Sequence, residues 1–265
     1  MRRSTEKEMM DLPGNPRELL VDDLRNLRII NRYLGGYQSV LRGLDRLVGA
    51  GKLSRFSLLD VGTGSGDIPA RITNWAQQRG IKASIVALEP EPVTAEIAAI
   101  VTQQQTNPPF IPLLQRLPSA VIPAAAGIQY ENERDFRCCG ISVVRGDGNA
   151  PPFRAASFDF VLASQLLHHF PEEKIVAQLR TWSRLARRAI VVSDLVRHPI
   201  AYYGIRFLTK LFTRNVMTLT DAPLSVRRAF TMGEWHELFR RAEIGPFQIF
   251  AVFPYRVLAL VSLDK

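Results

Sequence analysis

The feature that most constrains this chain is a glycine-rich loop between an apolar run and an amphipathic segment. Residues 56–61 lack the polar alternation of a half-exposed strand, which predicts a buried β-strand. Gly62, Gly64 and Gly66 follow at every second position, and residues 68–75 have the apolar spacing of a helix. Glycine allows a sharp turn and lets a ligand lie against the backbone. The first amides of the helix would face a bound anionic group. The stretch therefore predicts a nucleotide-binding strand–loop–helix unit.

The spacing of the glycines bears on which ligand is bound. A dinucleotide fingerprint, G-x-G-x-x-G, has its third glycine three residues after the second. Here Asp67 stands at that position. The segment from Asp60 to Asp67 resembles the first motif of class I S-adenosylmethionine-dependent methyltransferases, in the form D-x-G-x-G-x-G-D. That resemblance implies S-adenosyl-L-methionine as cofactor, and the loop alone leaves a nicotinamide site as the alternative.

The length of 265 residues suits one large domain or one domain with an extension. We expect a disordered tail and a helical cap over residues 1–50, and a methyltransferase domain over residues 51–265. No run approaches the roughly 20 apolar residues of a membrane span, and the charged start is not followed by an apolar signal region. The two cysteines are adjacent and lack partners at metal-ligand spacing, so we expect a reduced, cytoplasmic protein without a metal site.

The net charge of +9 has two interpretations. It could attract an acidic partner such as nucleic acid or an anionic membrane. However, Lys contributes only 6 of the 34 basic residues and the arginines are scattered, which favours an arginine-biased composition on a solvated surface. The oligomeric state cannot be read from the sequence.

Two amphipathic helices are expected ahead of the first strand. Asn15 and Glu18 have the spacing of a capping box, which predicts a helix start there, and disorder is expected before it, over residues 1–14. In methyltransferases that this chain resembles, such helices form a lid over the substrate, although simple packing is an equal alternative. Asn31, at the exit of the first helix, could reach the pocket.

Two further strands carry acidic residues at their ends. Residues 84–88 are predicted to form the second strand, which ends at Glu89, where a carboxylate can accept hydrogen bonds from both ribose hydroxyls. Residues 141–144 begin the third strand, and Asp147 follows it. The resemblance implies that this carboxylate accepts a hydrogen bond from the adenine amino group. The sequence from Gly146 through Asp159 resembles the third and fourth methyltransferase motifs.

Residues 107–140 break the pattern of alternating strands and helices. The stretch is rich in proline and alanine and has no sustained period, and loops longer than about 15 residues are uncommon. We expect a tolerated, partly disordered insertion without a catalytic role.

The fourth strand, residues 158–163, should bring the next segment to the reacting groups, because ligands bind at the carboxyl edge of open parallel sheets. The segment around His168 resembles the H-D-W-type segment of phenolic O-methyltransferases, which implies His168 as general base. The alternative is a structural or pocket-lining role. His169 replaces the acidic residue of that family, so the partner that fixes the tautomer is not identified. His198, just beyond the fifth strand, is the reserve candidate.

The expected fold is α/β, a Rossmann-like class I methyltransferase fold with a mostly parallel seven-stranded sheet. Residues 247–253 and 256–263 are predicted to form its closing antiparallel hairpin. Residues 199–212 could form a substrate-covering helix, a membrane-surface helix or ordinary core. The resemblance implies that the following residues bind the cofactor: Asp60, Gly62, Thr63, Gly64, Gly66, Asp67, Glu89, Asp147, Gly148, Ser164 and Gln165.

The chain most resembles the ubiquinone/menaquinone C-methyltransferase group. We expect methyl transfer to a hydrophobic small molecule, on the hydroxyl of a phenolic, polyketide or quinone-type acceptor. C-methylation of a similar acceptor, RNA methylation and a non-catalytic cofactor-binding partner protein are the alternatives. Nucleic-acid amino-methyltransferases carry an N-P-P-Y-like tetrad after the fourth strand, where this chain has residues 164–167, Ser-Gln-Leu-Leu. That difference argues against base methylation.

Overall fold

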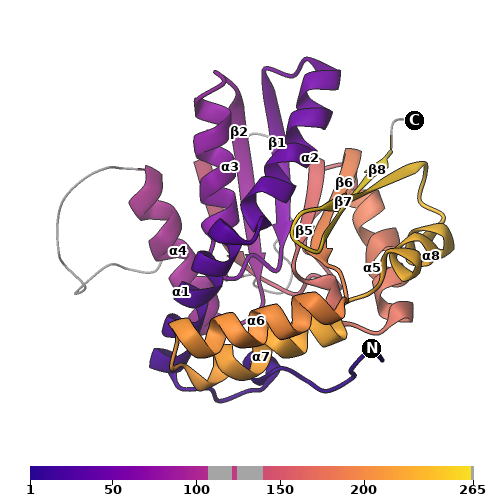
Figure 1. The fold of residues 1–265 in the computed structure, drawn as a ribbon. Helices are drawn as coiled ribbons and strands as arrows, with labels where there is room; N and C mark the ends of the chain where they lie inside the picture. The colour runs from indigo at the N-terminus through magenta and orange to yellow at the C-terminus, as the bar shows by residue number, and fades with distance from the viewer. Residues whose placement is uncertain (107–120, 124–139, 264–265) are drawn as a thin grey trace.

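The computed structural model describes residues 1–106, 121–123 and 140–263. Its centre is an eight-stranded sheet in the order β3-β4-β2-β1-β5-β6-β8-β7, with helices on both faces (Figure 1). The strands are β1 (Arg55–Val61), β2 (Lys82–Glu89), β3 (Val121–Pro123), β4 (Gly140–Arg145), β5 (Phe158–Ser164), β6 (Ala186–Leu195), β7 (Phe247–Val252) and β8 (Arg256–Ser262). The α-helices are α1 (Arg17–Tyr33), α2 (Gly36–Gly51), α3 (Asp67–Gln77), α4 (Pro92–Thr106), α5 (Glu172–Leu185), α6 (Pro199–Phe212), α7 (Val216–Arg228) and α8 (Met232–Ala242). Two 3₁₀ helices are η1 (Met9–Asp11) and η2 (Leu167–His169).

The strand directions confirm the predicted fold class. Strands β1 to β6 pair in parallel, and β8 runs antiparallel between β6 and β7. The difference from the seven predicted strands is β3, a short edge strand in which Val121 pairs with Val143 of β4. It lies inside the stretch predicted to be an insertion, whose remaining residues 107–120 and 124–139 lie outside the described residues.

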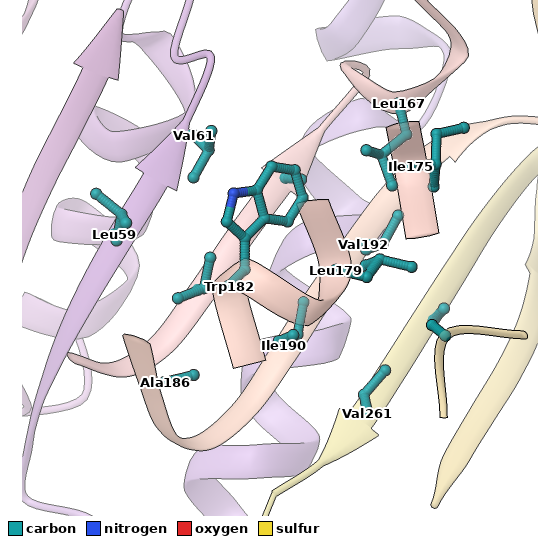
Figure 2. Close-up of a cluster of buried hydrophobic side chains, with 14 of the residues drawn as sticks. Leu59, Val61, Leu167, Ile175, Leu179, Trp182, Ala186, Ile190, Val192 and Val261 are labelled. Atoms are coloured by element: carbon teal, nitrogen blue, oxygen red, sulfur yellow. The ribbon is translucent and has the colours of Figure 1, made fainter. Parts of the chain in front are cut away.

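The two faces of the sheet are covered by different helices, because side chains alternate between the faces along each strand. On one face α2, α3 and α4 pack against residues such as Leu58 of β1 and Ala87 of β2. On the other face α5 and α8 pack against Leu59 and its neighbours, and Figure 2 shows the fully buried Trp182 of α5 at the centre of this cluster. The apolar strands predicted from the sequence are therefore buried on both sides.

Helices α1, α6 and α7 lie together beyond the carboxyl end of the sheet (Figure 1). Helix α7 packs against both α6 and α1, and α1 also contacts α4. The sequence analysis did not predict α7, which contains Pro223. Within the described part of the chain, no helix is long and apolar enough to cross a membrane.

The N-terminal segment differs from the prediction of disorder over residues 1–14. The backbone N–H groups of Met9 and Met10 donate to the two carboxylate oxygens of Asp221 on α7, at 2.9 and 3.0 Å. Further back, the Ser4 N–H donates to the carbonyl of Arg227. The segment is ordered by partners more than 200 positions away, which no local pattern could reveal.

The predicted capping box at Asn15 was wrong. Helix α1 begins at Arg17, with Pro16 in the N-cap position and without a side-chain cap. The amide group of Asn15 instead donates to the carbonyls of Met9 and Leu12, at 2.7 and 2.8 Å. The side chain therefore closes the turn of η1 and is not available to the helix.

Candidate active site

The glycine loop between β1 and α3 bends back onto the end of β2. Gly62 and Gly66 have φ angles of +67° and +72°, a region that favours glycine. A Cβ atom on Gly66 would lie 2.9 Å from Cγ2 of Thr102 on α4, so the loop also approaches that helix closely. The N–H groups of Gly62 and Thr63 both donate to the carbonyl of Leu88, at 2.8 and 3.1 Å. These bonds fix the loop at the carboxyl edge of the sheet.

Two buried carboxyl groups hold this loop. Asp60 accepts a 2.7 Å hydrogen bond from Oγ1 of Thr63. Glu89, at the end of β2, accepts from the N–H groups of Gly64 and Glu91, at 3.0 and 3.2 Å. Burial is the main cause that raises the pKa of both Asp60 and Glu89 to about 7. Each carboxylate oxygen of Glu89 keeps a further lone pair, so hydroxyl groups of a bound ligand could still donate to it.

Two buried oxygen atoms next to the loop have no hydrogen-bond partner among the described residues. One is Oδ2 of Asp67, whose Oδ1 accepts from Oγ of Ser65 at 2.7 Å. The Asp67 carboxylate also lies near Tyr37, where burial and that charge raise the pKa of the phenol. The other atom is Oγ of Ser164, at the end of β5. Unsatisfied buried oxygens are costly, and a ligand ammonium or hydroxyl group would satisfy them. The loop therefore fits the polar groups of S-adenosyl-L-methionine.

Asp147 and Gly148 follow β4 beside the same edge. Asp147 is exposed, and its Oδ1 accepts from the N–H of Asn149 at 2.8 Å. The carbonyl of Gly148 accepts from Nε1 of Trp182 at 2.9 Å, and a Cβ atom at this glycine would lie 2.5 Å from Val61. This second close approach positions the Asp147 loop next to the end of β1.

Gln165, directly after β5, connects the site to the helical cap. Its Nε2 donates to Oδ1 of Asn31 on α1 at 2.5 Å. The fully buried guanidinium of Arg256 donates to the carbonyl of Leu34, and burial lowers its pKa to about 10. Nη1 of Arg256 has no hydrogen-bond partner among the described residues. The sequence analysis missed this cation, because nothing local distinguishes it from the other arginines.

His168 is paired with a carboxylate that the sequence analysis did not assign. Nδ1 of His168 lies 2.7 Å from Oδ1 of Asp194, at the end of β6, and because a carboxylate only accepts, Nδ1 carries the proton. Oδ2 of Asp194 accepts from the N–H of Leu167 at 3.0 Å. Burial alone would raise the pKa of Asp194, but His168 and the hydrogen bonds lower it overall. Leu166, two residues before His168, packs against Gly62, and this contact links the His168–Asp194 pair to the glycine loop.

The other imidazole nitrogen of His168 faces the N-terminal segment. Its Nε2 lies 3.7 Å from Oε1 of Glu8, and Nε2 of His169 lies 3.8 Å from Oε2 of the same carboxylate. Burial is the main cause that raises the pKa of Glu8 to about 7. Nδ1 of His169 pairs with Asp11 at 3.0 Å, and Arg228 pairs with Asp11 and approaches Glu8. Glu8, His168 and His169 are close enough together to hold a metal ion.

His198 occupies a different environment. It is the N-cap of α6, where its Nδ1 accepts from the N–H of Ile200 at 3.2 Å. Its ring stacks on Tyr255, with ring centroids 4.5 Å apart. These contacts give His198 a role at the start of a helix, and they do not bring it to the carboxylate that pairs with His168.

The comparisons with known proteins agree with this geometry. Residues 59–189 match the family model described as a methyltransferase domain. This match identifies residues 59–189 as a methyltransferase domain. The comparison with curated proteins gave no match.

Solved structures show the same fold at low sequence identity. The plantazolicin methyltransferase BamL, solved with a triazolic desmethylPZN analog and SAH, is 12% identical with a TM-score of 0.56, over 94% of this chain and 98% of that one. Human N-acetylserotonin methyltransferase in complex with SAM is 17% identical with a TM-score of 0.51, over 99% of this chain and 64% of that one. The chain spans about half the length of two other similar proteins, 49% for an O-methyltransferase family 2 protein from Planctomyces limnophilus and 56% for a Nostoc punctiforme protein.

Proposed function

We propose that the protein transfers a methyl group from S-adenosyl-L-methionine to the hydroxyl of a hydrophobic small molecule of the phenolic, polyketide or quinone type. The observation that carries the proposal is the buried His168–Asp194 pair, which follows the segment packed on the glycine loop. Since a phenol has a pKa near 10, its hydroxyl benefits from a positioned base. Asp194 holds the proton on Nδ1 and leaves Nε2 as the basic nitrogen.

The proposed step balances on these groups. Bound S-adenosyl-L-methionine would supply the methyl group, with the carbon–sulfur bond exchanged for a bond to the acceptor oxygen and a neutral thioether as leaving group. Nε2 of His168 would take the hydroxyl proton of the acceptor. Alignment of the two reactants supplies the rest of the catalysis. Because Nε2 faces Glu8 in the structure, binding of the acceptor requires that the N-terminal segment move aside.

Three carboxylates around the glycine loop have proposed partners on the cofactor. The Glu89 carboxylate would accept from the ribose hydroxyls, and Asp147 from the adenine amino group. Oδ2 of Asp67, which has no hydrogen-bond partner among the described residues, suits the ammonium group of the methionine part. These roles rest on the glycine loop and on the strand ends that surround it.

The alternatives follow from particular observations. C-methylation of a similar acceptor, as in the ubiquinone/menaquinone group, is favoured by the cover over His168, since such an enzyme can work without a base at that position. RNA methylation is favoured by the net charge of +9 alone. A binding protein without activity would use the same loop and transfer nothing.

The experiment that tests the proposal follows labelled methyl from S-adenosyl-L-methionine into a whole-cell extract. The extract is then partitioned between an organic phase and an aqueous phase that contains the RNA. We expect label in the organic phase, and the labelled product then distinguishes an O-methyl from a C-methyl group. Label in the RNA would contradict the small-molecule proposal, and absence of label from both phases would support the binding protein.

A further inference from the structure

Helix α6 presents an apolar surface that nothing in the described chain covers. Four of its large side chains recur at positions i, i+3, i+7 and i+11, and a fifth ends the helix. These side chains are 63 to 77% exposed: Ile200, Tyr203, Phe207, Leu211 and Phe212. A contiguous exposed patch of this kind marks an interaction site.

The opposite side of α6 already supplies its contribution to the core. Ile205 is buried with Ala222 and Val226 of α7, and Thr209 is buried on the same side. Of the three interpretations of residues 199–212, ordinary core therefore does not explain the exposed stripe. A cover over the substrate does not explain it either, because these side chains are exposed, whereas the side of α6 that faces the rest of the domain is the one that packs on α7.

Exposed aromatic residues at the end of α1 and in the turn between β7 and β8 extend this surface. Tyr33 ends α1, next to residues of α1 that pack in the same cluster as Ile205, and it is 72% exposed. Phe253, in the turn between β7 and β8, is 85% exposed. That turn lies against the other two elements, since a Cβ atom on Gly35 would lie 2.6 Å from the Phe253 carbonyl and Tyr255 stacks on His198 at the start of α6. We call this set, with the five residues of α6, the α6 surface.

The charged side chains of α6 and of the residues that flank it in the sequence are of one sign. From residue 195 to residue 220 the sequence contains no Asp or Glu. Arg206 and Lys210 are exposed basic residues four positions apart on α6, and exposed Arg214 follows the end of the helix. Exposed Arg32 adjoins Tyr33. Aromatic and aliphatic side chains flanked by basic ones are typical of helices that lie in a membrane interface, where cations attract anionic lipids.

We propose that the α6 surface docks on an anionic lipid bilayer, with α6 in the plane of the interface and its apolar side chains at the headgroup boundary. The length of the helix, about 21 Å, is suited to lying on a membrane and not to crossing it. The docking does not depend on the acceptor proposed above. If the acceptor is dissolved in lipid, docking would bring the protein to the bilayer that contains it.

The test is sedimentation of the full chain with vesicles of phosphatidylcholine alone or mixed with phosphatidylglycerol. We expect binding to the mixed vesicles that weakens as salt is added. Phe207→Ser combined with Leu211→Ser should weaken it about tenfold or more, because each substitution removes a large apolar side chain that the bilayer would take out of water. Arg206→Gln combined with Lys210→Gln should weaken binding to the anionic vesicles at least about fivefold.

Control variants change exposed residues outside the α6 surface. Ile100→Ser on α4 is the control for the Phe207/Leu211 variant, and Arg240→Gln on α8 is the control for the Arg206/Lys210 variant. Affinity for S-adenosylhomocysteine should stay at the wild-type value in every variant, which separates loss of docking from loss of the fold or of cofactor binding. Wild-type protein that does not sediment with anionic vesicles would overturn the proposal. So would a dimer that dissociates in the Phe207/Leu211 variant, because the surface would then join two copies of the chain.

Discussion

At the scale of single residues, His168 decides between acid–base chemistry and alignment alone. We expect His168→Ala to lower the rate of transfer to a phenolic acceptor about 10²- to 10⁴-fold, the usual contribution of a general base. Affinity for S-adenosylhomocysteine should not change, since His168 contacts Asp194 and Glu8 and not the loop itself. The measurement compares turnover with binding by calorimetry, with His236→Ala on the exposed side of α8 as control. Undiminished turnover would remove His168 from the mechanism.

The same residue belongs to the cluster with Glu8 and His169, which makes metal removal informative. If Nε2 of His168 acts as a base, a chelator should leave the rate of methyl transfer unchanged. A rate that a chelator abolishes and one added divalent cation restores would instead mean that these three side chains hold a metal ion. The test is a rate measurement on protein dialysed against chelator, with metal content determined in parallel.

Glu89 predicts how cofactor affinity depends on pH. Burial raises the pKa of this carboxyl to about 7, so the ligand-free protein takes up a proton as pH falls through that value. The protonated group accepts less well from ribose hydroxyls, and the affinity for S-adenosylhomocysteine should therefore decrease below about pH 7. Titration calorimetry at several pH values measures this slope. Glu89→Gln should bind weakly and show a smaller slope, whereas an equal slope in the variant would assign the proton to the other raised group, Asp60.

At the scale of elements, the N-terminal segment and α7 depend on one arginine. Arg228 is buried and donates to the carbonyls of Glu6 and His169 while it pairs with Asp11. We expect Arg228→Ala to lower the free energy of unfolding by about 3 kcal/mol, because the buried carboxylate of Glu8 loses this nearby cation and the two carbonyls lose their donor. Arg227→Ala changes a partly exposed neighbour whose distance to Glu6 is 3.9 Å, and it should cost less than about 0.5 kcal/mol. Urea denaturation compares the two, and equal values would contradict the assigned role.

At the scale of the whole molecule, the sequence predicted those features of the fold that depend on residues close together in the chain. The apolar strands, the glycine loop and the closing hairpin all have local signals, and the structure contains them. The sequence did not predict the partner of His168, because Asp194 lies next to His168 only through the pairing of β5 with β6. Helix α7 and the contacts of the N-terminal segment were missed for the same reason, since their partners lie far away in the chain.

The order of the sheet also leads to a prediction for the stretch predicted to be an insertion. Strand β4 pairs with β2 over six positions on its inner side, and α4 already makes the crossover between them, so β2, α4 and β4 form a complete unit. In the described part of this stretch, β3 alone adds to the outer edge of the sheet. We therefore expect a variant in which a short glycine–serine linker replaces residues 107–139 to fold and to bind S-adenosylhomocysteine with wild-type affinity. Circular dichroism and calorimetry test this, and a folded variant that no longer binds the ligand would give the stretch a role at the cofactor site.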